Sequence, residues 1–185
     1  LVGIDAGFRQ LIEYPYGCTE QLSSKLLPLL PLRTLAKDFD TELPAHVDTV
    51  VAKTVAEILS RQGHDGGFVM WPESPASSPW VSAYAVWTLH EAARRGVPVP
   101  APAMTRAKQY LRRQLEVGKD EISRAAAPLL LDVLAELGAP DPGYMSQLFD
   151  ERRDLPVFSR ALLLHAMAVS KQPSGPVAEL TRELE

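Results

Sequence analysis

The sequence predicts an all-α fold, and three observations carry that prediction. Apolar residues recur at the three- and four-residue spacing of one helix face over most of the chain. Glycine and proline clusters divide these stretches into lengths that suit helices. The most strand-like stretch, residues 67–71, is too short to seed a sheet on its own.

The first expected helix starts near Cys18 and kinks or ends at Pro28 and Pro31, because proline removes a backbone donor. The second lies within residues 45–63, with His46 as a helix-start residue. Its apolar face repeats at helical spacing and consists of Val47, Val50, Val51, Thr54, Val55, Ile58 and Leu59.

Four further helices are expected within residues 83–94, 104–115, 122–137 and 157–169. The last two stretches are apolar nearly all round, which is typical of helices packed on several sides. We expect residues 83–94, 122–137 and 157–169 to form an inner layer of helices. The breakers between the stretches are residues 96–98, 138–140, 142–143 and 173–176.

A weak internal repeat aligns Ser82, Ser123 and Ser159, each near the start of a helix that ends at a breaker. Periods of about 40 residues are typical of helix-pair repeats, in which each unit buries its apolar face against the next. Such an array can be an open solenoid or a closed toroid, and periodicity does not separate the two.

Composition limits the class of protein. With 185 residues and 46% apolar content, the chain can fill one core, so residues 1–185 are expected to form a single domain. The net charge of −4, with both signs interspersed, argues against nucleic-acid binding. No apolar run has the length of a membrane span, and we expect no membrane contact by this domain. Because the chain starts at Leu1 without an export signal, we expect a fragment of a larger multidomain protein.

Cysteine and histidine usage excludes several kinds of site. One Cys allows no internal disulfide, and four scattered His residues with one Cys have no metal-ligand spacing. We therefore expect no metal and no cofactor. His90 and His165 are expected as packed core histidines on apolar helix faces, and His64 as a loop residue.

The only cysteine lies in the octapeptide Tyr-Pro-Tyr-Gly-Cys-Thr-Glu-Gln, residues 14–21. Residues three apart share one face of a helical turn, so the Cys18 sulfur and the Gln21 carboxamide can meet. If the thiolate attacks the amide carbon and ammonia leaves, the product is an intrachain thioester. The alternative for an isolated Cys-x-x-Gln is a buried free cysteine beside a solvated glutamine.

The octapeptide resembles the Cys-x-Glu-Gln signature of the alpha-2-macroglobulin and complement thioester proteins, in its bacterial form. This resemblance implies an alpha/alpha toroid, a terpenoid cyclase-like fold of concentric helices. Complete domains of the family are longer, so we expect an incomplete ring. The supporting motif comprises Tyr14, Pro15, Tyr16, Gly17 and Glu20. Both tyrosines are expected either to shield the thioester from water or to pack the helix start.

A second segment, residues 61–92, is similar to the one that follows the thioester helix in bacterial members. Its matching residues are Asp65, Gly66, Gly67, Phe68 and Trp71. The Asp-Gly-Gly sequence predicts a tight turn where a positive φ is accessible. The two aromatic side chains are expected to pack onto helix ends.

The resemblance implies a protease trap, an inhibitor without turnover. Cleavage of a bait region elsewhere exposes the thioester, and Gln21 becomes amide-linked to a lysine of the protease. The implied partners are target proteases and other domains of the same polypeptide, which cover the thioester. The implied location is periplasmic or extracellular, with lipoprotein anchoring through a missing N-terminal region and a role in host defence. Residues 68–79 lack the histidine that complement relatives use for hydroxyl transfer, which favours amines.

Three other classes stay open. A toroid-superfamily enzyme, a terpenoid cyclase or prenyltransferase beta chain, needs Asp clusters or a zinc site that the sequence does not display. A cysteine hydrolase with Cys18 at a helix start needs a positioned histidine and leaves Glu20 and Gln21 without a purpose. A helical-repeat interaction scaffold accounts for the periodicity but not for the octapeptide.

Overall fold

The computed structural model describes residues 17–38, 46–117 and 121–185, and these residues are helical throughout most of their length. In this part of the chain an isolated antiparallel bridge, Gln62 to Phe68, is the only β pairing. The all-α prediction is confirmed. The helices are α2 (Thr19–Asp38), α3 (Val47–Ser60), α4 (Pro79–Arg94), α5 (Ala101–Val117), α6 (Glu121–Glu136), α7 (Pro142–Asp150), the 3₁₀ turn η1 (Arg152–Asp154), α8 (Val157–Val169) and α9 (Ser174–Leu184).

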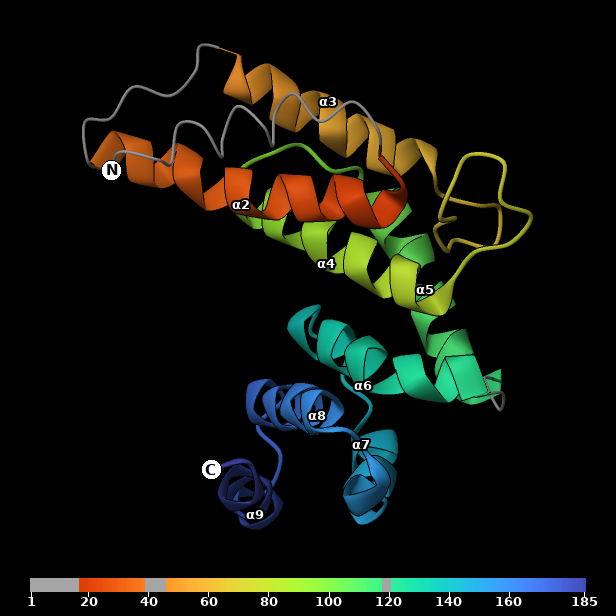
Figure 1. Cartoon of the computed structure of the whole chain (residues 1–185), viewed down its shortest axis with the longest axis vertical. Helices are drawn as coiled ribbons and strands as arrows, with labels where there is room; N and C mark the ends of the chain where they lie inside the picture. Colours follow the sequence, from red (N-terminus) through yellow and green to blue (C-terminus); the bar gives the residue numbers. More distant parts are fainter. Residues whose placement is uncertain (1–16, 39–45, 118–120) are drawn as a thin grey trace. The chain divides into compact units, whose positions relative to one another are not determined.

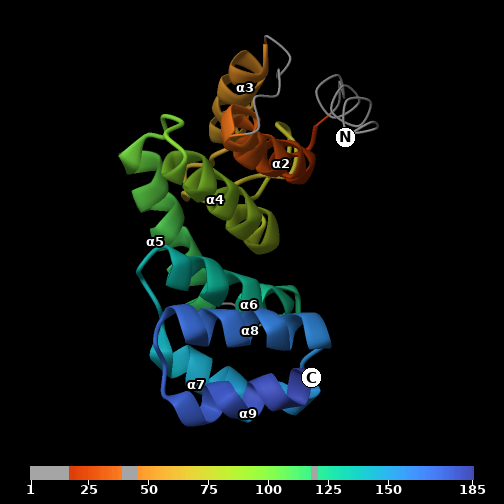
Figure 2. The same cartoon turned by 90° about the vertical axis from the view of Figure 1, so that its left-hand side faces the viewer.

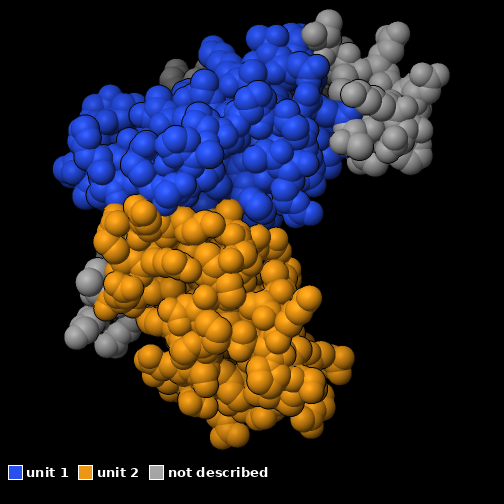
Figure 3. All heavy atoms as spheres, turned by 180° about the vertical axis from the view of Figure 1, so that it is seen from behind, with its two compact units in different colours: residues 1–106 blue, residues 107–185 orange. Residues whose placement is uncertain are grey.

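The chain divides into two compact units, residues 1–106 and 107–185 (Figure 3). In the first unit α2 packs side by side with α3 and α4 (Figure 1). The side chains that fill the space between them are aliphatic and almost fully buried, as the helical spacing of apolar residues predicts. They include Leu26, Leu29 and Leu30 of α2, Val51, Val55 and Ile58 of α3, and Val81, Val86 and Leu89 of α4.

Helix α2 does not end at Pro28 or Pro31 but continues to Asp38, so the expectation of an end there is wrong, and a kink at these prolines stays a prediction. Proline fixes φ near the helical value, so its cost in mid-helix is a missing hydrogen bond and crowding of the preceding turn. Leu29 and Leu30, which lie between the two prolines in sequence, are almost fully buried. Tertiary packing of this apolar face therefore outweighs the local preference of proline.

The glycine breakers lie where they were predicted, at the ends of α4 and α6. Gly96 has φ +77° and Gly138 has φ +66°, in the left-handed region that favours glycine. In each case the next residue also bonds back across the last turn: the Val97 N–H donates to the Ala92 carbonyl at 3.0 Å, and the turn after α6 repeats the pattern. These are Schellman-type helix ends.

The second unit is built around α6 and α8, which lie side by side (Figure 2). Two of its helices, α7 and α9, were not predicted, because their prolines and glycines were interpreted as breakers. Pro142 is instead the first residue of α7, directly after the N-cap Asp141, whose side chain accepts from the Tyr144 N–H at 3.0 Å. Pro173 likewise precedes α9 as its N-cap.

Helix α8 has the predicted bounds and packs against α6, α7 and α9, as expected of a helix packed on several sides, but part of its surface is exposed. Val157 is 63% exposed and Phe158 is 59% exposed, and only three of its side chains, Leu163, Ala166 and Met167, are buried. The apolar composition of α8 therefore led to a prediction of more burial than these side chains have. The inner-layer assignment and the single-domain boundary of residues 1–185 stay predictions.

Candidate functional site

The start of α2 brings Cys18 and Gln21 together through two reciprocal hydrogen bonds. The Cys18 N–H donates to Gln21 Oε1 at 3.0 Å, and the Gln21 N–H donates to Cys18 Sγ at 3.4 Å. The Leu22 N–H donates to the Cys18 carbonyl at 3.0 Å and closes the first turn. Cys18 is thus the N-cap and Gln21 the third helical residue. This arrangement is a capping box in which a thiol replaces the usual hydroxyl.

The capping box fixes the two groups that a thioester would join. One hydrogen bond holds the sulfur over the first turn, and the other holds the carbonyl oxygen of the Gln21 carboxamide against the Cys18 N–H. Cys18 is buried, whereas Gln21 is exposed. Because both side chains are oriented by backbone groups of one turn, little rotational freedom has to be lost before they react.

Gly17 and Glu20 occupy contrasting positions around this turn. A Cβ on Gly17 would come within 2.8 Å of Leu22 Cδ2, so a side chain there would displace the buried leucine. Glu20 is exposed on the first turn, where a carboxylate is favoured by the positive end of the helix dipole. Tyr14, Pro15 and Tyr16 lie outside the described residues.

Thr19 fastens the helix start to the loop that follows α3. This residue is fully buried; its N–H donates to the Met70 carbonyl at 2.9 Å, and its hydroxyl donates to the Val69 carbonyl at 2.6 Å. In Figure 1 the beginning of α2 accordingly lies beside this loop, residues 61–78. The loop of the second sequence motif therefore holds the helix start that carries Cys18.

The turn at residues 65–67 forms as predicted. Gly66 has φ +90°, and a Cβ on it would lie 2.6 Å from the Arg106 carbonyl oxygen. The Asp65 carboxylate accepts from the Gly67 N–H at 3.0 Å and from the Ser77 hydroxyl at 2.8 Å, which ties the two ends of the loop together. Only glycine fits at residue 66 without strain.

The two aromatic residues of this motif have different surroundings. Phe68 is fully buried, as predicted, and its N–H donates to the Ser82 hydroxyl of α4 at 2.7 Å. Trp71 is 48% exposed, so the expectation that it packs onto a helix end is wrong. Its backbone belongs to a surface turn closed by two bonds with Ser74, each 3.0 Å long.

Arg61 is a site residue that sequence reasoning missed. It follows the last residue of α3 and is only 9% exposed. Its Nη2 lies 3.4 Å from the Gly17 carbonyl oxygen and 3.5 Å from Glu57 Oε1. Its Nη1 is buried and has no hydrogen-bond partner among the described residues. The sequence signal was weak, since Arg61 only heads the second motif.

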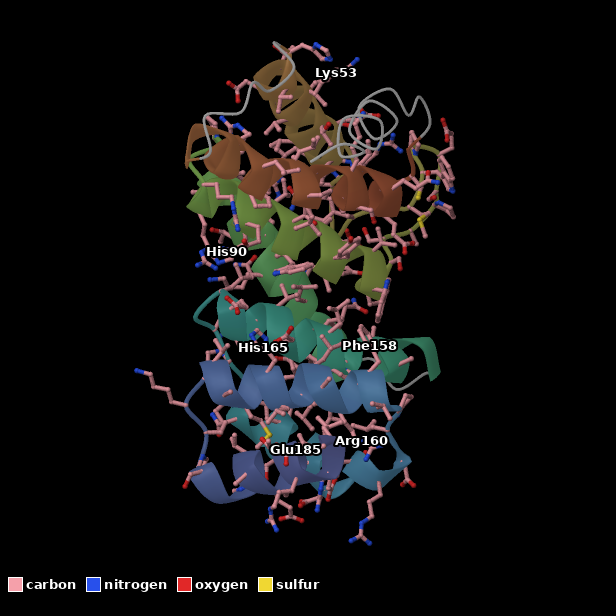
Figure 4. The ribbon with its side chains drawn as sticks, turned by 60° about the vertical axis from the view of Figure 1, so that its left-hand side comes forward. Lys53, His90, Phe158, Arg160, His165 and Glu185 are labelled. Carbon is pink, nitrogen blue, oxygen red and sulfur yellow. The ribbon has the colours of Figure 1, made fainter. Side chains whose placement is uncertain are left out.

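No histidine in the described part of the chain forms a hydrogen bond with Cys18. His46 precedes α3 and His64 is exposed in a turn, both as predicted. His90 is half-buried rather than enclosed in the core. His165 is wrongly predicted as a core residue: its ring is 54% exposed and pairs with Asp132 at 2.6 Å, on the side of α8 that faces α6 (Figure 4).

Two further properties concern the part of the chain that the structure describes. It contains no group of three or more His, Cys, Asp or Glu side chains arranged to hold a metal ion. None of its helices combines the length and the apolar character needed to cross a membrane.

A comparison with known protein families shows to which family the chain belongs. The sequence model of the A-macroglobulin TED domain matches residues 3–121, which include the octapeptide and the loop that holds it. The chain belongs to this family. The resemblance to the bacterial alpha-2-macroglobulin thioester domain is thereby confirmed.

Bacterial relatives match this TED domain over much of its length. It is 33% identical over 115 residues to alpha-2-macroglobulin of Escherichia coli K12, covering 58% of the chain and 7% of that protein. It is 31% identical over 143 residues to alpha-2-macroglobulin of Ralstonia nicotianae, covering 70% of the chain and 8% of that protein. The chain therefore spans less than a tenth of these relatives.

Solved structures show the fold of the TED domain. Native Escherichia coli alpha-2-macroglobulin, from domain MG7 to the C-terminus, matches 97% of the chain and 31% of that structure, with a TM-score of 0.82 and 23% identity. Salmonella alpha-2-macroglobulin reacted with methylamine matches 98% of the chain and 13% of that structure, with a TM-score of 0.79 and 25% identity. The alpha/alpha toroid-type fold is confirmed; that these residues make an incomplete ring stays a prediction.

Proposed function

We propose that this TED domain is the covalent element of a protease trap and carries a thioester between Cys18 and Gln21. The observation that supports the proposal is the reciprocal pair of hydrogen bonds between these two residues. In closure, a Sγ–Cδ bond forms and the Cδ–Nε2 bond breaks. The leaving nitrogen takes the thiol proton and departs as ammonia, which leaves an activated acyl group on Gln21.

The trapping step consumes the thioester. A lysine amine of the protease attacks Gln21 Cδ, the Cδ–Sγ bond breaks, and the proton lost by the amine goes to the sulfur. The products are an amide and a free thiol, so the domain acts once as an inhibitor and has no turnover. Structures of Escherichia coli alpha-2-macroglobulin activated by trypsin and by porcine elastase, which share the fold, support proteases as partners.

The remaining parts of the proposal concern the protein around the domain. Residues 1–185 act as one thioester domain, and other domains of the same polypeptide cover the reactive bond until a bait region is cut. The protein is periplasmic or extracellular and anchored as a lipoprotein. Cell fractionation with protease accessibility of the parent protein tests this location, and recovery in the cytoplasm would refute it.

The central experiment is intact-mass analysis of the parent protein with thiol titration. Native protein should weigh less than its sequence by one ammonia and show no titratable thiol at Cys18. Methylamine should add to Gln21 and release one thiol. The variants Cys18→Ala and Gln21→Ala should keep the calculated mass and bind no methylamine. A native protein with the calculated mass, a titratable Cys18 and no methylamine adduct would refute the proposal.

A cysteine hydrolase is less well supported by the same geometry. Such an enzyme needs a histidine base at the thiol. Among the described residues, the hydrogen bonds of Cys18 go to Gln21 and to the backbone of α2, and no histidine contributes one.

A further inference from the structure

The peptide unit that joins Gly17 to Cys18 is hydrogen-bonded at both ends. Its carbonyl oxygen, that of Gly17, lies 3.4 Å from Nη2 of Arg61. Its N–H, that of Cys18, donates to Oε1 of Gln21 at 3.0 Å. One amide therefore connects a guanidinium from the end of α3 to the carbonyl group that a thioester would use.

The two hydrogen bonds strengthen each other. A donor at the oxygen of an amide polarises the whole unit, so its N–H becomes a better donor. Arginine stays protonated at any physiological pH, which makes the first bond charge-assisted. Arg61 is 9% exposed, so water screens its charge much less than at the surface.

Both acyl-transfer steps place negative charge on the same atom. When the sulfur attacks Gln21 Cδ, the tetrahedral species carries its charge on Oε1. When an amine later attacks the thioester, the charge returns to Oε1 before the Cδ–Sγ bond breaks. A donor already aimed at this oxygen lowers both barriers, as in an oxyanion hole.

We propose that the Cys18 N–H is the oxyanion donor of this domain and that Arg61 is a positioning residue that orients and polarises it through the Gly17 carbonyl. The inference rests on the proposed thioester between Cys18 and Gln21. Arg61 transfers no proton in either step. The proton balance stays as stated above, from thiol to ammonia in closure and from amine to sulfur in opening.

The remaining hydrogen bonds of Arg61 support a role beyond the fold. Its Nη1 is buried and unpaired in the described part of the chain, an arrangement that costs free energy. Its carboxylate neighbour Glu57 lies 3.5 Å from Nη2, on the same atom that contacts Gly17, and is partly exposed. A buried cation with so few hydrogen-bond partners contributes little to stability, but its electric field at the Gly17 carbonyl is strong.

The kinetic test uses Arg61→Met, Arg61→Lys and the matched control Glu57→Gln in the parent protein, with the melting temperature of each measured first. The rate of thiol release by methylamine is the readout. Loss of a direct oxyanion donor costs about 100-fold or more, so loss of its support by Arg61→Met should cost about tenfold. Arg61→Lys keeps the charge and should recover most of the rate. Glu57→Gln removes the competing ion pair and should match or exceed the native rate.

The spectroscopic test does not need the thioester. In the unreacted 185-residue chain, the Cys18 amide proton should move upfield in Arg61→Met, should largely return in Arg61→Lys and should not move upfield in Glu57→Gln. An unchanged Cys18 resonance overturns the inference, and so does a changed resonance with an unchanged methylamine rate. If native protein forms no thioester, the proposed function fails, while the Cys18 resonance still reports whether Arg61 polarises this peptide.

Discussion

The Thr19 hydroxyl donates a hydrogen bond of 2.6 Å to the Val69 carbonyl, across 50 residues of sequence. The Thr19 N–H adds a second bond, to the Met70 carbonyl at 2.9 Å. Together they hold the first turn of α2 against the loop after α3. The two sequence motifs are thus one structural unit, in which the loop fixes the helix start that carries Cys18.

Thr19→Val should destabilise the chain while keeping the shape of the side chain. The variant buries a methyl group where the hydroxyl donates, so the free energy of unfolding should fall by about 1–3 kcal/mol. Thr19→Ser keeps the hydroxyl and should lose less. Urea denaturation of both variants is the measurement; equal losses would show that the hydroxyl bond contributes little.

Gly66→Ala should be much more damaging than Gly96→Ala. Both residues have positive φ, +90° and +77°, but only Gly66 has backbone within 4 Å of the added carbon. We expect a loss of about 1 kcal/mol at residue 96 from backbone strain alone, and about 3 kcal/mol at residue 66. Chemical denaturation separates the two contributions. Equal losses would mean that the loop shifts away from Arg106 at little cost.

Arg152→Met should loosen α9, whereas Arg153→Met should have little effect. Arg152 is buried, contacts Glu183 at 3.1 Å and the Phe149 carbonyl at 2.8 Å, and pairs with Glu179. Removing it leaves two partly exposed carboxylates without their partner, at a cost of about 1–2 kcal/mol. Limited proteolysis should then cut between α8 and α9. Resistance equal to that of the exposed Arg153 variant would contradict this.

Asp132 should make stability depend on pH. Burial raises the pKa of this carboxyl above its ordinary value of 3.8, against the hydrogen bond and charge of His165, and Glu136 raises it further. The fold thus favours the protonated form, and that stabilisation is present below pH 3.8 and is lost as pH rises through the raised pKa.

The variant Asp132→Asn tests this sign. Its melting temperature should exceed that of the native chain at pH 7, and the difference should shrink as the pH is lowered through the raised pKa of Asp132. The amide oxygen can still accept from His165, so the geometry of the pair is kept. The exposed Asp150→Asn is the control. A melting temperature lowered at pH 7 would show that the Asp132 carboxylate stabilises the contact between α6 and α8.

The proposed thioester should react with amines and barely with hydroxyls. Residues 68–79 contain no histidine, and a hydroxyl is a weak nucleophile without a base to take its proton. The protease-activated parent should therefore form adducts with methylamine but few with glycerol, as intact mass reports. Abundant glycerol adducts would point to His64 or to a base from another domain.

Much of the fold was predictable because its signals are local. The bounds of α8 follow from its apolar run, and the ends of α4 and α6 follow from Gly96 and Gly138. Helix α7 was missed although Pro142 after Asp141 is a helix-start pattern, so the signal was present and given the wrong sense. Continuation of α2 through Pro28 depends on packing against α3 and α4, which no local pattern contains.

In the candidate site, too, some features follow from local sequence and others depend on tertiary packing. Cys18 and Gln21 are three residues apart, so their meeting follows from helix geometry, and the capping box adds the reason. Arg61 reaches Gly17 across 44 residues, and its position depends on how α2 and α3 pack. The exposure of Trp71 and His165 was likewise decided by tertiary neighbours, since the sequence alone placed Trp71 on a helix end and His165 in the core.

Viewed as a helix start alone, residues 18–21 differ by a single atom from the ordinary Ser-x-x-Gln cap found on helices with no chemistry at all. Exchanging sulfur for oxygen at residue 18 should leave the helix, its packing and its docking onto the loop in place while abolishing acyl transfer. Reactive and inert versions of this domain are therefore neighbours in sequence space, one substitution apart. The fold is compatible with both versions, and whether the side chain of residue 18 carries sulfur or oxygen determines whether the domain is reactive or inert.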